Sequence, residues 1–186
     1  MARFVSELLL VVVGLAAFAS AQEQAVPRQC GYDRWPVKIL SDNDRAHVNF
    51  TPVDATVAKL AAIPIHEIPY PQANRIAPEE FQVYRVRARL LRVRREKDSD
   101  LHLLLADLDT PEIRMIAEIP APECAVGTGH EQEYKAAREV ILTVPPNTIV
   151  ELVGVAFFDY LHEQHGAAKN GIELHPVFRL EALRSR

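Results

Sequence analysis

The chain has 186 residues, 25% of them charged, and a formal net charge of -4 at pH 7. A mildly acidic protein has no overall field that attracts nucleic acid, so any anion-binding site must be local. The sequence contains no P-loop, G-x-G-x-x-G, G-x-S-x-G or C-x-x-C motif. Their absence disfavours nucleotide-dependent enzymes, serine hydrolases of the G-x-S-x-G type and thiol-redox enzymes.

The first residues have the pattern of a secretory signal peptide. Arg3 precedes an apolar run at 8–19, and the small residues Ala19-Ser20-Ala21 form a cleavage signal. About 12 apolar residues are too few for a membrane span, which needs roughly 20. We therefore expect a signal peptide at 1–21, a mature chain from Gln22, a secreted or periplasmic location and no transmembrane segment after cleavage. The alternative is an uncleaved N-terminal anchor.

Cys30 and Cys124 are the two cysteines of the chain. In an oxidising compartment such an even pair usually forms a disulfide, which we predict here. Closing a loop of roughly 90 residues would stabilise the fold by about 4 kcal/mol in the chain-entropy model. A cysteine metal site is the less favoured alternative, because each residue stands alone.

Residues 22–80 are expected to form an N-terminal extension with one short helix. A short strand is predicted at 37–40. The helix is predicted to start at Thr51-Pro52, since threonine caps helices and proline suits the first turn, and to end before Pro64. Further prolines up to position 78 indicate a stiff, extended linker.

The main domain is expected at 81–186, with strands at 81–94, 101–107, 114–119, 149–158 and 172–183 and a helix at 131–143. Apolar and charged residues alternate along the first strand, as in a half-buried strand. The alternation changes phase near Leu90-Leu91, which predicts a β-bulge. Gly154 within the fourth strand predicts a bend of the kind found at barrel corners.

Three strands, a helix and two more strands also occur in this order in OB-folds and in the related barrel of staphylococcal-type nucleases. The part of the chain that resembles them is roughly 81–183. The resemblance implies a mainly β fold: a five-stranded OB-like barrel with one helix between strands 3 and 4, preceded here by the short helical extension.

The whole chain also resembles an uncharacterised family of bacterial exported proteins. The segments that carry this resemblance are Trp35-Pro36-Val37-Lys38, Tyr84-Arg85-Val86-Arg87-Ala88, Asp98-Ser99-Asp100-Leu101-His102-Leu103, Met115-Ile116-Ala117-Glu118-Ile119-Pro120 and Asn170-Gly171-Ile172-Glu173-Leu174-His175-Pro176. That family supplies no established activity to transfer to this chain.

A metal-dependent activity is suggested by acids in two predicted turns. Asp109-Thr110-Pro111-Glu112 is similar to a D-T-P-E segment of staphylococcal-type nucleases, in which the acids bind calcium and activate water. Asp98 and Asp100 occupy a turn like one that supplies a further acid there. The resemblance implies a divalent-metal-dependent phosphodiesterase or nuclease with calcium or another divalent ion. The preferred interpretation is a polar hairpin turn and no cofactor.

The loop at 159–170 is a candidate ligand-binding loop, because loops set on a rigid sheet often carry function. Aspartate and histidine side chains also suit zinc or another transition metal. The interpretation preferred over a metal site is structural: Asp159 and His175 fix the loop by hydrogen bonds, and His162 and His165 face solvent. The candidate residues of the loop and of the strand after it are Asp159, Tyr160, His162, His165 and His175.

Arg85, Arg87 and Arg89 form an arginine row on one face of the first strand. A basic groove with aromatic platforms binds single strands, and OB-folds bind oligonucleotides or sugars. The simpler interpretation pairs these arginines with acids on neighbouring strands: Glu118, Glu151 or Glu181.

The sequence therefore predicts an exported binding module for an extended polymer, nucleic acid or glycan, or for a protein partner such as an envelope protein. The alternatives are the metal-dependent phosphodiesterase or nuclease and a structural envelope protein without catalysis. No catalytic residue is assigned.

Overall fold

The structure is a computed structural model that describes residues 29–31, 33–161 and 165–183. The predicted signal peptide and His162 lie outside these residues. Within the described part of the chain, no helix is both long enough and apolar enough to cross a membrane.

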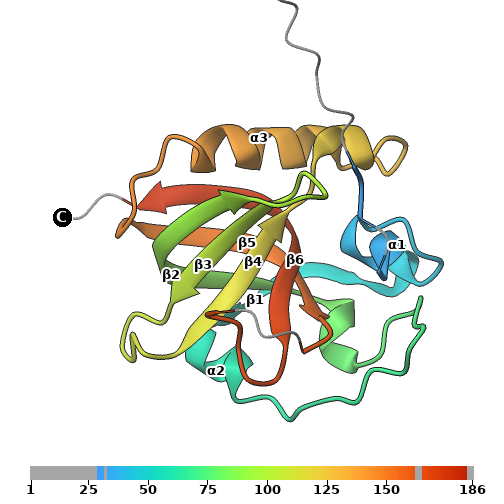
Figure 1. The fold of residues 1–186 in the computed structure, drawn as a ribbon, viewed down its shortest axis with the longest axis horizontal. Coiled ribbons are helices and arrows are strands. Elements are labelled where there is room, and N and C mark those ends of the chain that lie inside the picture. Colours follow the sequence, from blue (N-terminus) through green and yellow to red (C-terminus); the bar gives the residue numbers. More distant parts are fainter. Residues whose placement is uncertain (1–28, 32, 162–164, 184–186) are drawn as a thin grey trace, which may run out of the picture.

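Five strands close into a barrel, which Figure 1 shows from one side. They are β2 (Gln82–Arg95), β3 (Leu101–Ala106), β4 (Arg114–Ile119), β5 (Ile149–Phe158) and β6 (Ile172–Leu183). Neighbours follow the order β2-β3-β4-β6-β5, and pairing between β2 and β5 closes the barrel. The β4–β6 pair is parallel and the other barrel pairs are antiparallel. This mixed barrel is consistent with the predicted OB-like fold.

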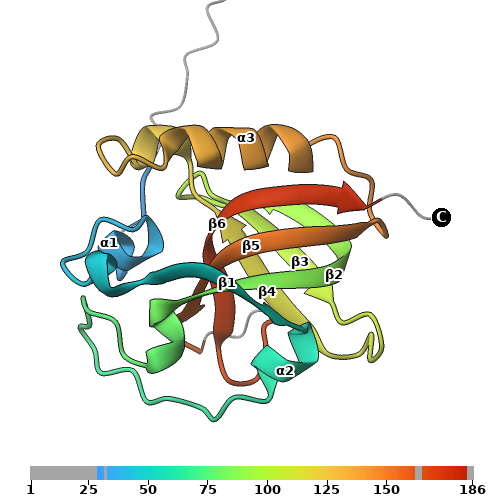
Figure 2. The same cartoon turned by 180° about the vertical axis from the view of Figure 1, so that it is seen from behind.

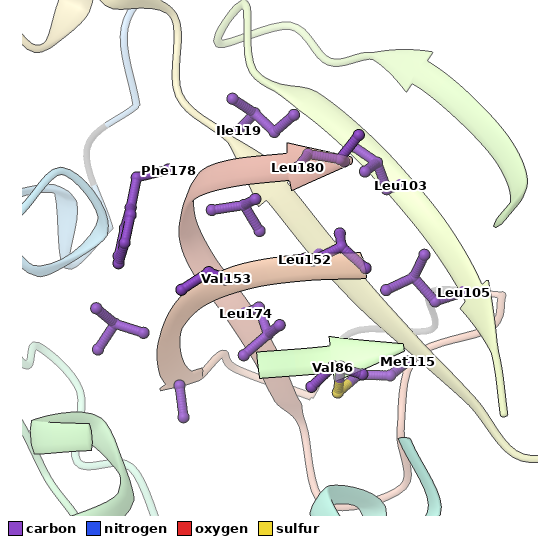
Figure 3. Close-up of a cluster of buried hydrophobic side chains, with 14 of the residues drawn as sticks. Val86, Leu103, Leu105, Met115, Ile119, Leu152, Val153, Leu174, Phe178 and Leu180 are labelled. Carbon is purple, nitrogen blue, oxygen red and sulfur yellow. The ribbon is translucent and has the colours of Figure 1, made fainter. Parts of the chain in front are cut away.

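The helix α3 (Glu131–Ile141) lies between the third and fourth barrel strands, as predicted. It spans one end of the barrel, and the short helix α2 (Val57–Ala61) lies near the other end (Figures 1 and 2). The apolar residues that α3 buries are Tyr134, Ala137 and Ile141. Figure 3 shows apolar side chains of the strands, among them Leu103, Leu152 and Leu174, gathered inside the barrel.

Two local irregularities let the long strands bend, and both were predicted. The register of β2 against β3 shifts between Leu90 and Arg92. The register of β5 against β6 shifts on both sides of Gly154. A Cβ atom at Gly154 would lie 2.7 Å from the backbone oxygen of Pro176, so a side chain there would collide with β6. Bulges of this kind bend the strand and increase its local twist, which helps a long strand to follow the curve of the barrel.

Two predictions for the N-terminal extension are wrong. Residues predicted as a strand at 37–40 belong instead to the helical turn α1 (Trp35–Lys38), which has Pro36 in its first turn, and to the turn that follows it. Proline without a backbone N–H is tolerated in a first helical turn but removes a donor from a strand ladder.

The residues expected to start the helix at Thr51 form instead the strand β1 (Asn49–Ala55), which pairs with β2 in parallel. Pairing with an existing barrel edge supplies backbone partners that a short isolated helix lacks. The helix begins after Thr56, whose side-chain oxygen accepts a hydrogen bond from the backbone N–H of Lys59 at 3.1 Å. A threonine therefore caps the helix, as predicted, but it is Thr56 and not Thr51.

The extension packs on the barrel. Leu40, Val57 and Leu60 belong to the same buried cluster as the strand residues. The predicted disulfide is present: Cys30 and Cys124 are bonded, and it joins the start of the described chain to the segment before α3.

Candidate binding pocket and metal site

Part of the barrel's outer face is polar but buried. Leu174 of β6 points into the core, so its neighbours Glu173 and His175 point outward. His175 is nevertheless 0% exposed and Glu173 only 3% exposed. The N-terminal segment covers this face: the Arg34 guanidinium carbon lies 4.5 Å from the centre of the Phe157 ring, and the Lys38 Nζ lies 5.1 Å from it.

Three side chains from three different strands or turns meet under this cover. The nitrogen or oxygen atoms that Asp100, Glu118 and His175 can each offer lie within 4.8 Å of one another. His175 Nε2 lies 3.3 Å from Asp100 Oδ2, and its Nδ1 lies 3.2 Å from Glu118 Oε2. Asp100 precedes β3, Glu118 belongs to β4 and His175 belongs to β6. We call these three residues the buried triad.

Asp100 is held in place by the backbone. Its Oδ1 accepts a hydrogen bond from the N–H of Ala121 at 3.0 Å, which leaves Oδ2 directed at His175. Glu118 is held by His102, whose Nδ1 lies 2.9 Å from Glu118 Oε1.

Burial changes the acid–base behaviour of the triad. It raises the pKa of Asp100 to about 6, although the hydrogen bond from Ala121 opposes this shift. It lowers the pKa of His175 to about 4, although the negative charge of Glu118 opposes that shift. At pH 7 the Asp100 carboxyl is therefore mainly ionised and the His175 ring is neutral.

Two further ionisable groups lie close by. Burial first, and then the charges of Asp159 and Glu118, raise the pKa of Glu173 well above its ordinary range. Burial lowers the pKa of Lys38, but the surrounding acids outweigh it, and the net shift is upward. Lys38 Nζ lies 3.6 Å from Asp159 Oδ2 and remains charged.

A pocket of about 360 Å³ borders one member of the triad, Glu118. His102 and Glu118 contribute to its wall from the barrel, and Glu96 to Asp98 contribute from the turn between β2 and β3. In OB-folds, ligands bind on the face of the second and third barrel strands, between the loop that joins strands 1 and 2 and the loop that joins strands 4 and 5. Here the first of these loops is the turn between β2 and β3. Asp159, the first residue after β5, belongs to the second loop and also lines the pocket.

Acids outnumber bases among the described residues that line the pocket. The acids are Asp33, Glu96, Asp98, Glu118 and Asp159, and the bases are Lys38, Arg94, Lys97 and His102. Arg94 and Glu96 form an ion pair with each other, as do Lys38 and Asp159. The pocket therefore has the electrostatic character of a cation site.

The arginine row lies on another part of the surface. Arg87 Nε donates to Glu151 Oε2 at 2.7 Å, and Arg85 Nη1 donates to Asp54 Oδ1 at 3.0 Å. Arg89 Nη1 donates to the backbone oxygen of Asn147 at 3.0 Å. The pairing with Glu151 follows the simpler interpretation of this row. Contact with an anionic polymer stays a prediction, and such a ligand would have to displace these partners.

The four acids that were predicted to bind a divalent metal lie in two separate turns. Asp98 and Asp100 stand before β3, whereas Asp109 and Glu112 stand after it. Six strand residues at about 3.3 Å each separate the two turns by roughly 20 Å. One ion cannot contact both turns. Asp100 instead lies beside His175, a residue predicted for ligand binding, and beside Glu118.

The loop residues are divided in the same way. Asp159 lines the pocket, whereas the Tyr160 hydroxyl donates to the backbone oxygen of Pro69 at 3.2 Å and its ring contacts Tyr70 edge-on. His165 is exposed. His162 lies outside the described residues. The loop thus brings Asp159 to the pocket, and His175 of the following strand belongs to the buried triad.

Sequence reasoning missed Glu118 and His102 as members of a site, since Glu118 was considered only as a partner for arginines. A signal was available. Both are polar residues inside strands that are otherwise apolar, at 101–106 and 115–119. A buried polar side chain in such a strand needs a partner, and that need points to a cluster.

Comparisons with known proteins add little. A search of protein-family profiles and a search of curated proteins both find no match to this sequence. A protein assigned as an aspartyl-tRNA synthetase from Leishmania major Friedlin matches with a TM-score of 0.41 and 10% identity, over 73% of this chain and 21% of that one. A tRNA fluorescent labeling enzyme matches with a TM-score of 0.29 and 13% identity, over 57% of this chain and 30% of that one.

The chain therefore spans between about a fifth and a third of the length of those two proteins. Similarity at this level says nothing about function, because one barrel architecture serves many activities. The resemblance to an exported bacterial family stays a prediction.

Proposed function

We propose that this protein is an exported binding module whose pocket, beside the turn between β2 and β3, takes a positively charged segment of an extended polymer. The observation that carries the proposal is the position and charge of the pocket. It occupies the ligand position of OB-like barrels, and five acids line it against two lysines, one arginine and one histidine. The disulfide supports export, because disulfides persist mainly in oxidising compartments.

The charge of the pocket favours a cationic ligand over nucleic acid. A phosphate backbone entering it would meet the exposed parts of Asp33 and Asp98, which repel it. An amino group entering the same space would find carboxylate acceptors. Such amino groups occur in basic peptide segments and in amino-sugar polymers.

Fluorescence anisotropy tests this proposal with two probes of equal length, labelled oligolysine and labelled single-stranded DNA, in buffer without added metal. We expect oligolysine to bind, with an affinity that falls as salt rises, since the attraction is screened. DNA should bind more weakly. Tighter binding of DNA than of oligolysine would contradict the proposal and direct attention to the arginine row.

A matched pair of variants locates the binding. Asp98→Asn removes one charge from the pocket and keeps the oxygen that accepts from the backbone N–H of Asp100. It should weaken oligolysine binding about fivefold, as for one ion pair of roughly 1 kcal/mol. Glu139→Gln removes the same charge from the exposed face of α3 and should leave the affinity unchanged. Equal effects of the two variants would show that only net charge matters.

A further inference from the structure

The buried triad leaves two ring nitrogens and one carboxylate oxygen without hydrogen-bond partners. A neutral imidazole has one N–H and one bare nitrogen. Both nitrogens of His175 face carboxylate oxygens, at 3.3 and 3.2 Å. One of these contacts therefore sets a lone pair against a carboxylate unless a proton or a metal ion lies between the groups. Neither ring nitrogen makes a hydrogen bond of acceptable geometry, and neither does Asp100 Oδ2.

Buried polar atoms without hydrogen-bond partners lower the stability of a fold. His175 and Asp100 are both 0% exposed, so bulk water does not contact their side chains. An unpaired buried polar group destabilises a fold, and an unpaired buried charge does so more strongly. Lys38 and Arg138 act on the acids of this region through space, but each is engaged elsewhere: Lys38 with Asp159, and Arg138 with the backbone oxygens of Ile119 and Ser99.

We propose that Asp100, Glu118 and His175 bind a divalent transition-metal ion. Each offers one ligand atom, and the atoms already lie within 4.8 Å of one another. An imidazole with two carboxylates is a donor set that zinc and similar ions accept. Calcium is disfavoured because it takes six to eight oxygen ligands, and magnesium because it demands an octahedral oxygen shell.

The surroundings of the triad have the features of a metal site. Metal ligands are usually oriented by a second layer of hydrogen bonds. Here the Ala121 N–H orients Asp100, and His102 orients Glu118. Glu118 also lines the pocket, so one of the three proposed ligands borders that space. Three protein ligands leave a coordination position for water or for a group of a bound molecule.

This site stands on the three buried side chains whichever ligand the pocket takes. The metal binding and the oligolysine binding can therefore fail separately. The site differs from the one predicted from the acidic turns, because it excludes Asp109 and Glu112 and includes a histidine.

Isothermal titration of zinc into mature, untagged, chelator-treated protein with its disulfide intact tests the proposal. We expect one zinc ion per chain. Asp100→Asn keeps the oxygen that accepts from Ala121, and His175→Gln keeps much of the ring's volume; each should weaken zinc binding at least about 100-fold, beyond the effect of losing a second-layer partner. Asp109→Asn makes the same chemical change as Asp100→Asn at the far end of β3 and should bind zinc as the wild type does.

A second readout covers the case in which a triad variant does not fold. Anomalous diffraction from zinc-soaked wild-type crystals should place the ion among the three side chains, and millimolar calcium should not displace it. Absence of zinc uptake, uptake equal in all variants, displacement by calcium or an ion located elsewhere would each overturn the proposal. A proton shared among the three groups would then be the cation of the triad.

Discussion

The carboxylate of Asp107 joins two separate segments of the chain. Its Oδ2 accepts from the N–H of Ala58 at 2.8 Å, and its Oδ1 accepts from the N–H groups of Asp109 and Thr110 and from the Thr110 hydroxyl. Burial raises the pKa of Asp107, but these hydrogen bonds outweigh it and the net shift is downward from the ordinary value of 3.8. This residue therefore fastens α2 to the turn between β3 and β4.

We expect Asp107→Asn to lower the free energy of unfolding at neutral pH by about 1–3 kcal/mol, because an amide nitrogen would face an N–H donor. The folded pKa lies below the unfolded one, so the contribution of the ionised group is complete above about pH 4 and is lost as the pH falls through the folded value. Urea unfolding at neutral pH and near pH 3 should thus give a smaller difference between wild type and variant in acid. An equal difference at both pH values would contradict this account.

At the scale of elements, a buried ion pair joins Arg34, the residue before α1, to Glu80, which stands just before β2. The Arg34 guanidinium donates to both carboxylate oxygens of Glu80, at 2.9 and 2.7 Å, and to the backbone oxygen of Phe158. Glu80 in turn accepts from the N–H groups of Phe158 and Ile76. The pair thus connects the cover of the polar face to the end of β5.

Arg34→Ala should lower the free energy of unfolding by about 3–5 kcal/mol, because it leaves the Glu80 charge buried without its partner. Lys135→Ala is the comparison, since it breaks an exposed pair with Glu139 on α3 and should change the free energy by less than about 1 kcal/mol. Urea unfolding measures both. A loss for Arg34→Ala as small as that for Lys135→Ala would mean that the ion pair does not hold the extension in place.

At the scale of the whole molecule, the disulfide links Cys30 and Cys124 across 94 residues of sequence. The double variant Cys30→Ser/Cys124→Ser should lower the free energy of unfolding by about 4 kcal/mol, chiefly because the unfolded chain gains freedom. Its denaturant slope should rise, since a chain without the cross-link exposes more surface when unfolded. Urea unfolding of the wild type in reductant should match the double variant. A change below about 1 kcal/mol would show that packing alone holds the extension.

Local sequence pattern determined most of the fold. The alternation of apolar and charged residues places β2, the phase change near Leu90 marks its bulge, and Gly154 marks the bend of β5. These three features could be predicted because each depends only on residues that are adjacent in sequence or on a single glycine. The extension was harder, because a strand at 49–55 exists only by pairing with β2, and no local pattern contains its partner.

Tertiary structure alone decided the site. Asp100, Glu118 and His175 are far apart in sequence and meet because β3 pairs with β4, and β4 pairs in parallel with β6. Sequence shows each as a polar residue near or within a strand, but which polar residues share a face depends on how the barrel closes. Their burial depends on the extension, which the Arg34–Glu80 pair and the disulfide hold over that face. The sequence thus determines which polar residues stand near or within the strands. That Asp100, Glu118 and His175 meet follows only from strand order and long-range packing.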